Sequence, residues 1–262
     1  MFLCVDRSTS AQIYRISIPD EASAAIDWER KEICILSKAR TMQDADLGQF
    51  IDDHIAPRIL SRLWPLVLHA GIVTYAGGCA LLAGASGHGK STLTAFLHRS
   101  GWQMLGDDAA LLAFKDGVLH AHATYRRLSL LPDSLENVMG EPTDHAADRA
   151  VKRRIAFADT PRQAASHPVV AIFVLAAPGD ARTITRRPLH GTEACMGLLE
   201  NSFSFNPTDA AESMHRLAEA SRIAQSVPIY QIDYPRDYNA LPRLRDTLAA
   251  VVTAPLVERK PS

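Results

Sequence analysis

The chain has 262 residues, of which 47% are hydrophobic and 22% are charged, and its formal net charge is -1. This length is enough for one large α/β domain with a small appendage, and the composition is that of an ordered globular protein. The near-neutral charge gives no support to a surface that binds nucleic acid. The four cysteines are scattered without a C-x-x-C pair, which argues against a zinc site and favours thiols in a reducing compartment.

Targeting signals are missing from the pattern as well. No apolar run reaches the length that spans a membrane, and Asp6 comes too early for the apolar core of a signal peptide. We therefore expect a cytoplasmic protein with neither a membrane nor a nucleic acid as partner. Whether the chain forms a homo-oligomer is left open.

The pattern of residues 1–62 predicts a small β-rich subdomain with a linking helix. Short apolar strings broken by polar residues at 12–19 and 32–37 are typical of strands. Helical spacing then follows up to Trp64, before Pro65 interrupts it. The apolar residues at this spacing are Phe50, Ile51, Ile55, Ile59, Leu60 and Leu63.

Residues 63–255 predict the main domain, because strand and helix signals alternate there as in a sheet covered on both faces. The most apolar run, at 169–177, indicates a central strand, and residues 132–162 are polar and irregular. Residues 256–262 are expected to be a flexible tail. The other expected strands are at 66–75 with a kink at Ala70-Gly71, 79–83, 102–105 and 228–232, with a hairpin at 115–118 and helices at 91–99, 191–202, 209–225 and 241–252.

One motif carries most of the chemical information. Residues 84–91 read Gly84-Ala85-Ser86-Gly87-His88-Gly89-Lys90-Ser91 and fill every fixed position of the P-loop pattern G-x-x-x-x-G-K-[ST]. The glycines allow backbone N–H groups to turn inward around a phosphate, Lys90 supplies a positive charge, and the Ser91 hydroxyl can ligate Mg²⁺. We expect these residues and Thr92 to bind the phosphates of ATP, with the ring of His88 left in solvent.

Asp107 and Asp108 follow the strand expected after the P-loop helix. Ligands of open α/β sheets bind at the carboxyl ends of strands, so a crossover would bring this pair beside the γ-phosphate. One carboxylate could then hold Mg²⁺ while the other accepts a hydroxyl proton from the acceptor. An ordinary turn is the alternative for two adjacent acids.

His69 stands on the strand just upstream, where a neutral imidazole could reach an acid or a phosphate oxygen. A lone histidine of this kind is more often a structural hydrogen-bonding residue. Arginine forks suit a γ-phosphate or an acidic peptide, although a solvated face is the default for any one basic residue. The basic candidates for the phosphate or substrate site are Arg126, Arg127, Lys152, Arg153 and Arg154.

The order of these motifs resembles the HPr kinase-like family of P-loop serine kinases. The resemblance runs through His69-Ala70-Gly71-Ile72-Val73, the glycine loop with its preceding strand, and Gly106-Asp107-Asp108. It implies a P-loop kinase core in which Asp107 is the general base on an acceptor serine, Asp108 lies near Mg²⁺ together with Ser91, and His69 supports the catalytic carboxylate. Lys90 would stabilise the transferring phosphoryl group.

Weaker similarity is found in Tyr125-Arg126-Arg127-Leu128-Ser129-Leu130-Leu131-Pro132, Lys152-Arg153-Arg154 and Tyr234-Pro235-Arg236-Asp237-Tyr238. These segments resemble short HPr kinase-related proteins, including the lasso-peptide kinases, which implies phosphorylation of the carboxy-terminal serine of a precursor peptide. The glutamate-containing signature of HPr kinase/phosphorylase proper is missing after the aspartate pair. Its loss argues against HPr as the substrate and leaves Mg²⁺ to Ser91 and the aspartates.

The motifs are compatible with three functions. The first is an ATP- and Mg²⁺-dependent serine kinase that acts on a peptide or protein. The second is a nucleotide-gated regulatory or assembly ATPase, which would release phosphate to water without labelling a peptide. The third is a kinase of a small hydroxyl metabolite such as free serine, which the motifs alone do not distinguish from the first.

Overall fold

The computed structural model describes residues 4–7, 13–18, 20–124, 127–142, 153–156 and 166–254. By its internal contacts the chain divides into two compact units, one of Met1–Leu63 with Ser204–Ser213 and one of Trp64–Phe203 with Met214–Ser262. The expected tail at 256–262 lies outside the described residues. Among the described helices, none combines the length and apolar character that a membrane crossing requires.

The smaller unit contains an antiparallel sheet with the strand order β1-β2-β3-β4. One face of this sheet is buried, as the alternating burial of β2 and β3 shows. Phe205 joins the core of this unit, because its ring lies 4.5 Å from that of Tyr14 and 5.7 Å from that of Trp28. The elements are β1 (Cys4–Arg7), β2 (Ile13–Ile18), β3 (Ala22–Asp27), β4 (Glu32–Lys38), α1 (Asp44–Phe50), one π-helical segment (Ile51–Ile55) and α2 (Ala56–Leu63).

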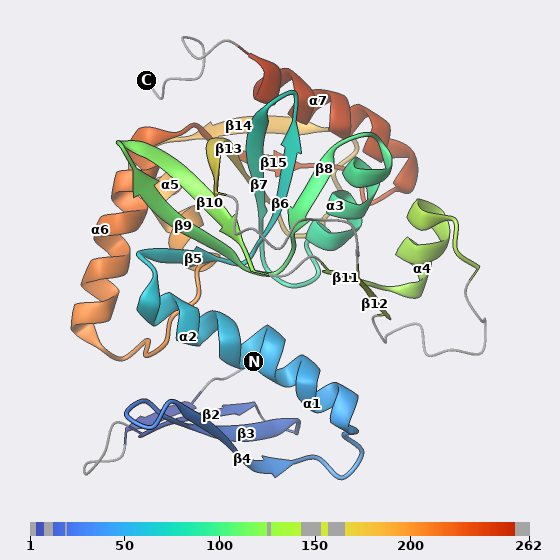
Figure 1. Ribbon diagram of the computed structural model, residues 1–262. Helices are drawn as coiled ribbons and strands as arrows, with labels where there is room; N and C mark the ends of the chain where they lie inside the picture. The colour runs from blue at the N-terminus through green and yellow to red at the C-terminus, as the bar shows by residue number, and fades with distance from the viewer. Residues whose placement is uncertain are drawn as a thin grey trace. The chain divides into compact units, whose positions relative to one another are not determined.

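The larger unit is built on a mixed sheet that has nine strands in the described residues, with the path β5-β9-β10-β13-β7-β6-β8 (Figure 1). The central strand β13 pairs in parallel with both β7 and β15, and β14 pairs with β15. The strands are β5 (Leu66–Leu68), β6 (Ala70–Tyr75), β7 (Gly78–Ala83), β8 (Gln103–Gly106), β9 (Ala110–Lys115), β10 (Val118–Ala123), β13 (Ser166–Leu175), β14 (Thr185–Leu189) and β15 (Ile229–Asp233).

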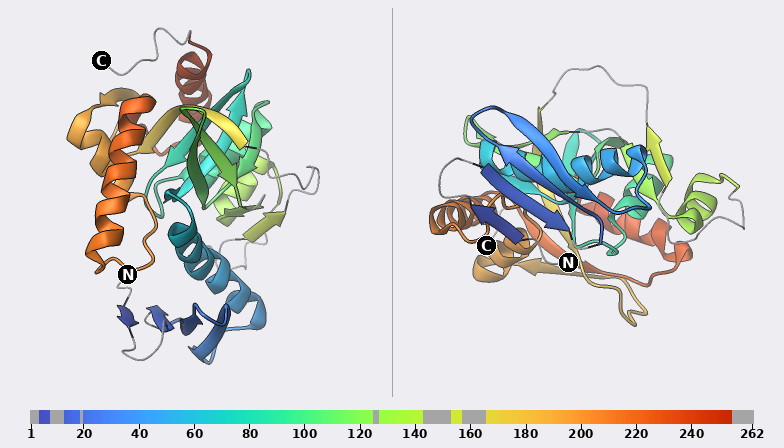
Figure 2. Two further views of the ribbon diagram at one scale, coloured as in Figure 1. Left: turned by 60° about the vertical axis from the view of Figure 1, so that its left-hand side comes forward. Right: turned by 90° about the horizontal axis from the view of Figure 1, so that it is seen from below.

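Helices cover both faces of this sheet (Figures 1 and 2). Leu81 and Ile172 face α5 (Gly191–Glu200) and α6 (Ala210–Ser226) in one core cluster. Their neighbours Leu82 and Phe173 point the other way, towards α3 (Lys90–Arg99) and α7 (Leu241–Thr253). Successive strand residues alternate between faces, so a continuous apolar run fills both layers. The expected α/β class, with a mixed sheet, flanking helices and a separate N-terminal β-rich part, is confirmed.

The segment expected to be irregular contains regular structure. Its described residues form a short helix, α4 (Pro132–Ser134), which continues as a π-helical segment (Leu135–Met139), and the strand β12 (Arg153–Ala156). β12 pairs antiparallel with β11 (Arg127–Leu130), and this pair, here called the β11–β12 ribbon, is a sheet of its own. The expected single kinked strand at 66–75 is two strands, because the chain leaves β5 at His69 and pairs with different neighbours on either side.

Candidate functional site

Three segments that are far apart in the chain end at one edge of the larger sheet. β6 lies between β7 and β8 and is antiparallel to both, so β7 and β8 run parallel to each other. The carboxyl ends of β7 and β8 and the amino end of β6 therefore share an edge. Gly84 follows β7, Asp107 follows β8, and His69 precedes β6, which brings the three expected motifs together.

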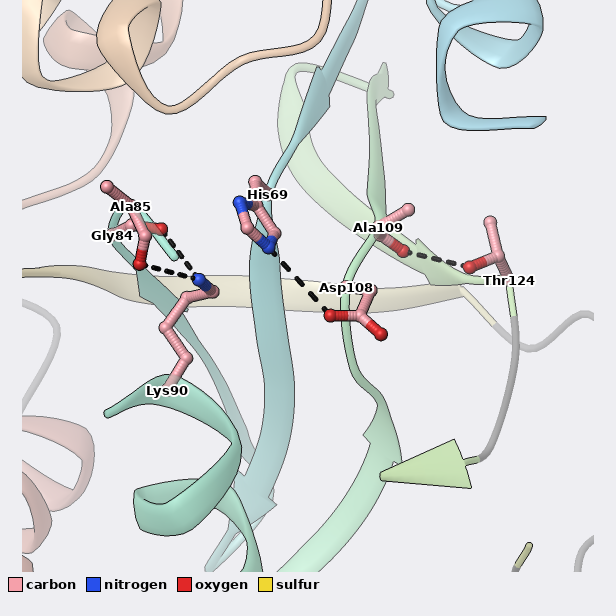
Figure 3. Close-up of polar contacts among 7 residues, drawn as sticks. All are labelled: His69, Gly84, Ala85, Lys90, Asp108, Ala109 and Thr124. Atoms are coloured by element: carbon pink, nitrogen blue, oxygen red, sulfur yellow. Dashed lines mark hydrogen bonds and ion pairs between the residues drawn. The ribbon is translucent and has the colours of Figure 1, made fainter. Parts of the chain in front are cut away.

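The glycine loop, residues 84–91, forms the first wall of the site. Gly84, Gly87 and Gly89 have φ angles of 159°, 83° and 86°, the positive range that side chains disfavour. Lys90 begins α3 and is buried, and its Nζ donates hydrogen bonds to the carbonyl oxygens of Gly84 at 2.7 Å and Ala85 at 3.1 Å (Figure 3). The ammonium group is therefore held within the loop, where a phosphate would offer it charged acceptors.

Contacts with the end of β13 and with Arg236 fix the shape of this loop. Nδ1 of His88 lies 2.9 Å from the carbonyl oxygen of Leu175, at the end of β13. Arg236 donates to the carbonyl oxygens of His88 at 3.1 Å and Ala176 at 2.5 Å, and its guanidinium lies 3.9 Å from the ring centre of Tyr234. The expectation of a solvated His88 ring is therefore wrong, because the ring has a protein partner that ties the loop to the central strand.

Asp107 is enclosed by protein. Only 1% of it is exposed, and neither carboxylate oxygen has a hydrogen-bond partner of good geometry among the described residues. Burial and the neighbouring charge of Asp108 raise its pKa to about 7, although the nearby Ser91 hydroxyl and Lys90 ammonium act in the opposite direction. A Cβ atom at Gly71 would lie 3.3 Å from Oδ1 of Asp107 and 2.4 Å from Oγ1 of Thr94, so only glycine leaves room for both side chains.

Asp108 occupies a different place from its neighbour. Its φ angle is +71°, and the Ala109 amide donates to the Asp107 carbonyl oxygen at 3.0 Å, which makes a three-residue turn centred on Asp108. This turn sends the two carboxylates in different directions. Oδ1 of Asp108 lies 3.8 Å from Nε2 of His69, whose ring points towards it (Figure 3).

A pocket of about 110 Å³ joins the glycine loop to these groups. Asp108 lines this pocket and Asp107 does not, so the second aspartate of the pair is the one that faces the pocket. Ser129 and Leu131, at the end of β11, also line the pocket. The lining residues are His69, Ser86, Gly87, Gly89, Lys90, Ser91, Thr92, Asp108, Ser129 and Leu131.

The basic candidates are only partly described. Arg126 and Lys152 lie outside the described residues, and Arg127 is the first residue of β11 but its side chain is not described. Arg154 pairs directly with Ser129 across the β11–β12 ribbon, whereas Arg153 pairs with Leu130. Directly paired residues of an antiparallel ladder share a face, so Arg154 lies on the face of Ser129 and Arg153 on the other.

Sequence analysis did not single out Ser129, Leu131, Gly71, Thr94 or Arg236 as functional residues. The signal for Arg236 was present in the segment that resembles the short kinases, but its contact with the loop spans 148 positions in the chain. Ser129 sits in a strand too short to show alternation. Gly71 lies inside a strand, where a glycine is a sign of close approach by another group.

The residues around Asp107 fit a magnesium ion. No group of three or more His, Cys, Asp or Glu side chains with metal-binding geometry occurs in the described residues. Mg²⁺, however, usually takes only one or two carboxylates and keeps waters or phosphate oxygens as its other ligands. In the part of the chain that the structure describes, the two buried oxygens of Asp107 have no hydrogen-bond partner, and together with the nearby Ser91 hydroxyl they are a donor set of this type.

No protein-family model and no curated protein sequence matches the chain. Among solved structures, the chain is similar to the Hpr(Ser) kinase/phosphatase from Coxiella burnetii, with 15% sequence identity and a TM-score of 0.36. The aligned region covers 70% of this chain and 93% of that chain.

Proposed function

We propose that the chain is an ATP- and Mg²⁺-dependent kinase that transfers the γ-phosphate of ATP to a serine hydroxyl. The observation that carries this proposal is the single pocket lined by Lys90 of the glycine loop, Asp108 and His69. A phosphate-binding loop alone would serve an ATPase equally well. A carboxylate facing the same pocket, paired with a histidine, supplies the proton acceptor that transfer to a hydroxyl requires.

Each group of the site has its own role in the proposed transfer. The loop amides and Lys90 bind the β- and γ-phosphates and stabilise the charge that develops on them. Asp108 accepts the proton of the serine hydroxyl while the serine oxygen forms its bond to phosphorus and the bond to the leaving ADP oxygen breaks. His69 orients the Asp108 carboxylate. Positioning of the two reactants in one pocket supplies the remaining acceleration.

Magnesium would be held by Ser91 and Asp107, and it would neutralise phosphate charge when bound. This exchanges the roles that the family resemblance implies, where Asp107 is the base and Asp108 lies near the metal. The support for the exchange is geometric. Asp107 is enclosed beside Ser91, whereas Asp108 lines the pocket next to His69.

For the acceptor we propose the carboxy-terminal serine of a lasso-type precursor peptide. The support is the resemblance of the segments around Arg127, Arg153 and Arg236 to kinases that modify such peptides.

The test is one incubation series with γ-labelled ATP and Mg²⁺, offering four acceptors separately: a precursor peptide that ends in serine, the HPr protein, free serine, and water alone. We expect label on the peptide. Label on free serine would move the proposal to a metabolite kinase, and release of phosphate to water with no labelled acceptor would favour the nucleotide-gated ATPase. A Lys90→Met variant, which loses the loop ammonium, serves as the control for contaminating kinases.

A further inference from the structure

The lining of the pocket contains a polar group that belongs neither to the glycine loop nor to the aspartate pair. Ser129 is 5% exposed, lines the pocket, and its Oγ has no hydrogen-bond partner among the described residues. Leaving a buried hydroxyl without a partner is unfavourable, because the group loses its hydrogen bonds to water. A hydroxyl kept at this cost in the wall of a pocket indicates a ligand group that completes its hydrogen bonding.

The chain places an arginine directly opposite this hydroxyl. Ser129 and Arg154 are paired across the β11–β12 ribbon, so their side chains leave the same face from Cα atoms about 5 Å apart. Leu128 and Leu130, on the other face of β11, are buried in the core, which fixes the orientation of the strand. Arg154 is half-buried, so its guanidinium is partly shielded from water.

If the acceptor serine is at the end of a chain, the pocket must bind its terminal carboxylate as well as its hydroxyl group. Its carboxylate is separated from its hydroxyl oxygen by only two carbon atoms, so both groups must be accommodated near Asp108. Two like charges at close range repel, and the ammonium of Lys90 is taken by the glycine loop. The carboxylate therefore needs its own cation and hydrogen-bond donor, and the planar fork of an arginine suits it best.

We propose that Ser129 and Arg154 form a subsite that binds the terminal carboxylate of the acceptor serine. This inference rests on the proposed kinase function and adds a chemical requirement to it, a free carboxylate beside the phosphorylated hydroxyl. Arg154 supplies the charge and Ser129 donates its hydroxyl proton. Selection for a chain end follows, because an acceptor serine within a chain has an amide at this position.

The first measurement is binding without turnover. A short acetylated peptide that ends in serine is prepared with a free carboxylate and with a terminal amide, and its affinity for the full chain is measured by calorimetry with a non-hydrolysable ATP analogue and Mg²⁺. We expect the acid to bind about ten-fold more tightly than the amide, the effect of one charge-assisted hydrogen-bonded pair. Arg154→Gln should remove this preference, and Arg153→Gln, the same change on the other face of the ribbon, should retain it. Equal binding of the two peptides by the wild-type protein would overturn the subsite.

The second measurement separates the subsite from the proposed function. Transfer of label to the same peptides tests the kinase function. If the protein bound the acid peptide more tightly than the amide but transferred no label, the kinase function would be refuted and the subsite would stand. In transfer, Arg154→Gln and Ser129→Ala should raise KM for the acid peptide about ten-fold and change kcat little. An equal loss of kcat on both peptides in Arg154→Gln would show that Arg154 serves the phosphoryl group, and would overturn the assignment.

A loss of affinity in Ser129→Ala would not be explained by a loss of stability. Ser129→Ala removes a buried hydroxyl that has no hydrogen-bond partner among the described residues, so the melting temperature should stay the same or rise. A weaker affinity for the acid peptide in a variant at least as stable as the wild type assigns the loss to the missing donor. Unchanged affinity in Ser129→Ala would remove Ser129 from the subsite.

Discussion

Nε2 of His69 lies 3.8 Å from Oδ1 of Asp108, and the two residues come from opposite ends of strands β6 and β8. The chain brings them together because β6 enters the shared edge where β8 leaves it. His69 occupies the break between β5 and β6, and its amide donates to the Asn201 carbonyl oxygen at 2.7 Å, which anchors the backbone there. A histidine so held can set the direction of the Asp108 carboxylate.

Asp108→Asn is expected to lower kcat by about 10² to 10⁴, because the amide removes the group that accepts the hydroxyl proton. The backbone should be unaffected, since asparagine adopts the positive φ of +71° as readily as aspartate. Kinetics with the serine peptide and the affinity for an ATP analogue check both points. Asp246→Asn, an exposed carboxylate on α7, is the matched control. Full transfer by Asp108→Asn, with a loss in Asp107→Asn alone, would restore the assignment given by the family resemblance.

Asp107 should make the stability of the metal-free protein depend on pH. Its pKa is raised from 3.8 to about 7, so between these values the folded state binds a proton that the unfolded state has released. Stability therefore falls as pH rises through this range, by about 1 kcal/mol per pH unit, and levels off above the folded pKa. Urea unfolding in the presence of a chelator should show this slope in the wild type and a flatter curve in Asp107→Asn. Parallel curves would contradict the buried carboxyl.

Magnesium should act on the same residue. Above the folded pKa the ionised Asp107 is buried beside Ser91, and its carboxylate has no hydrogen-bond partner of good geometry among the described residues, so a bound cation should relieve the unfavourable charge. We expect Mg²⁺ with an ATP analogue to raise the melting temperature of the wild type and of Asp108→Asn, and to raise that of Asp107→Asn much less. The reverse ranking of the two variants would place the metal at Asp108, where the family resemblance has it.

Gly71→Ala is expected to destabilise the protein by about 1 to 3 kcal/mol, because the new methyl group would overlap the Thr94 hydroxyl, which would lie 2.4 Å away. Thr94→Ala removes this hydroxyl, so the double variant should recover part of the loss. Chemical unfolding of the two single variants and the double variant measures the coupling. Gly179→Ala is the control, since its Cβ would meet only the Ala177 carbonyl oxygen, at 4.0 Å. Additive losses would show that the two positions are independent.

Most of the site could be predicted from the sequence because its parts are local. The glycine loop has fixed spacing, and Asp107 and Asp108 follow it by one helix and one strand, so strand-end logic placed them at the same edge. The α/β class was equally accessible, since the apolar run of β13 and the helical periods are each continuous. Local patterns carry this information without any knowledge of distant contacts.

The features that were not predicted from the sequence depend on contacts between distant segments or on local turns. The different directions of the Asp107 and Asp108 carboxylates come from a turn centred on a non-glycine residue with positive φ, for which the sequence has no strong signal. The β11–β12 ribbon was missed because each strand has only four residues, too few to show an alternating pattern, and the two strands pair with each other across a long stretch of sequence. The short helix from Pro132 was missed because, even with the π-helical segment that continues it, it has less than three turns.

Arg236→Gln is expected to weaken ATP binding more than it weakens catalysis. Arg236 joins the His88 carbonyl of the glycine loop to the Ala176 carbonyl after β13, and it stacks on Tyr234, whose hydroxyl would lie 2.5 Å from a Cβ atom at Gly89. Glutamine cannot span both carbonyls, so the loop amides would lose part of their fixed orientation towards the phosphates.

We expect the KM for ATP to rise about ten-fold in Arg236→Gln, kcat to change by less, and unfolding free energy to fall by about 1 to 2 kcal/mol. The KM for ATP of Arg236→Lys should lie between those of the wild type and Arg236→Gln, since one ammonium can donate to a carbonyl but lacks the planar fork that reaches both carbonyls. Arg243→Gln, an exposed arginine on α7, is the control for the loss of charge. If Arg236→Gln lowered stability without changing the KM for ATP, Arg236 would support the fold alone. If it lowered kcat with no change in KM, the guanidinium would instead act on the transferring phosphoryl group, because an interaction made only in the transition state affects turnover and leaves ground-state binding unchanged.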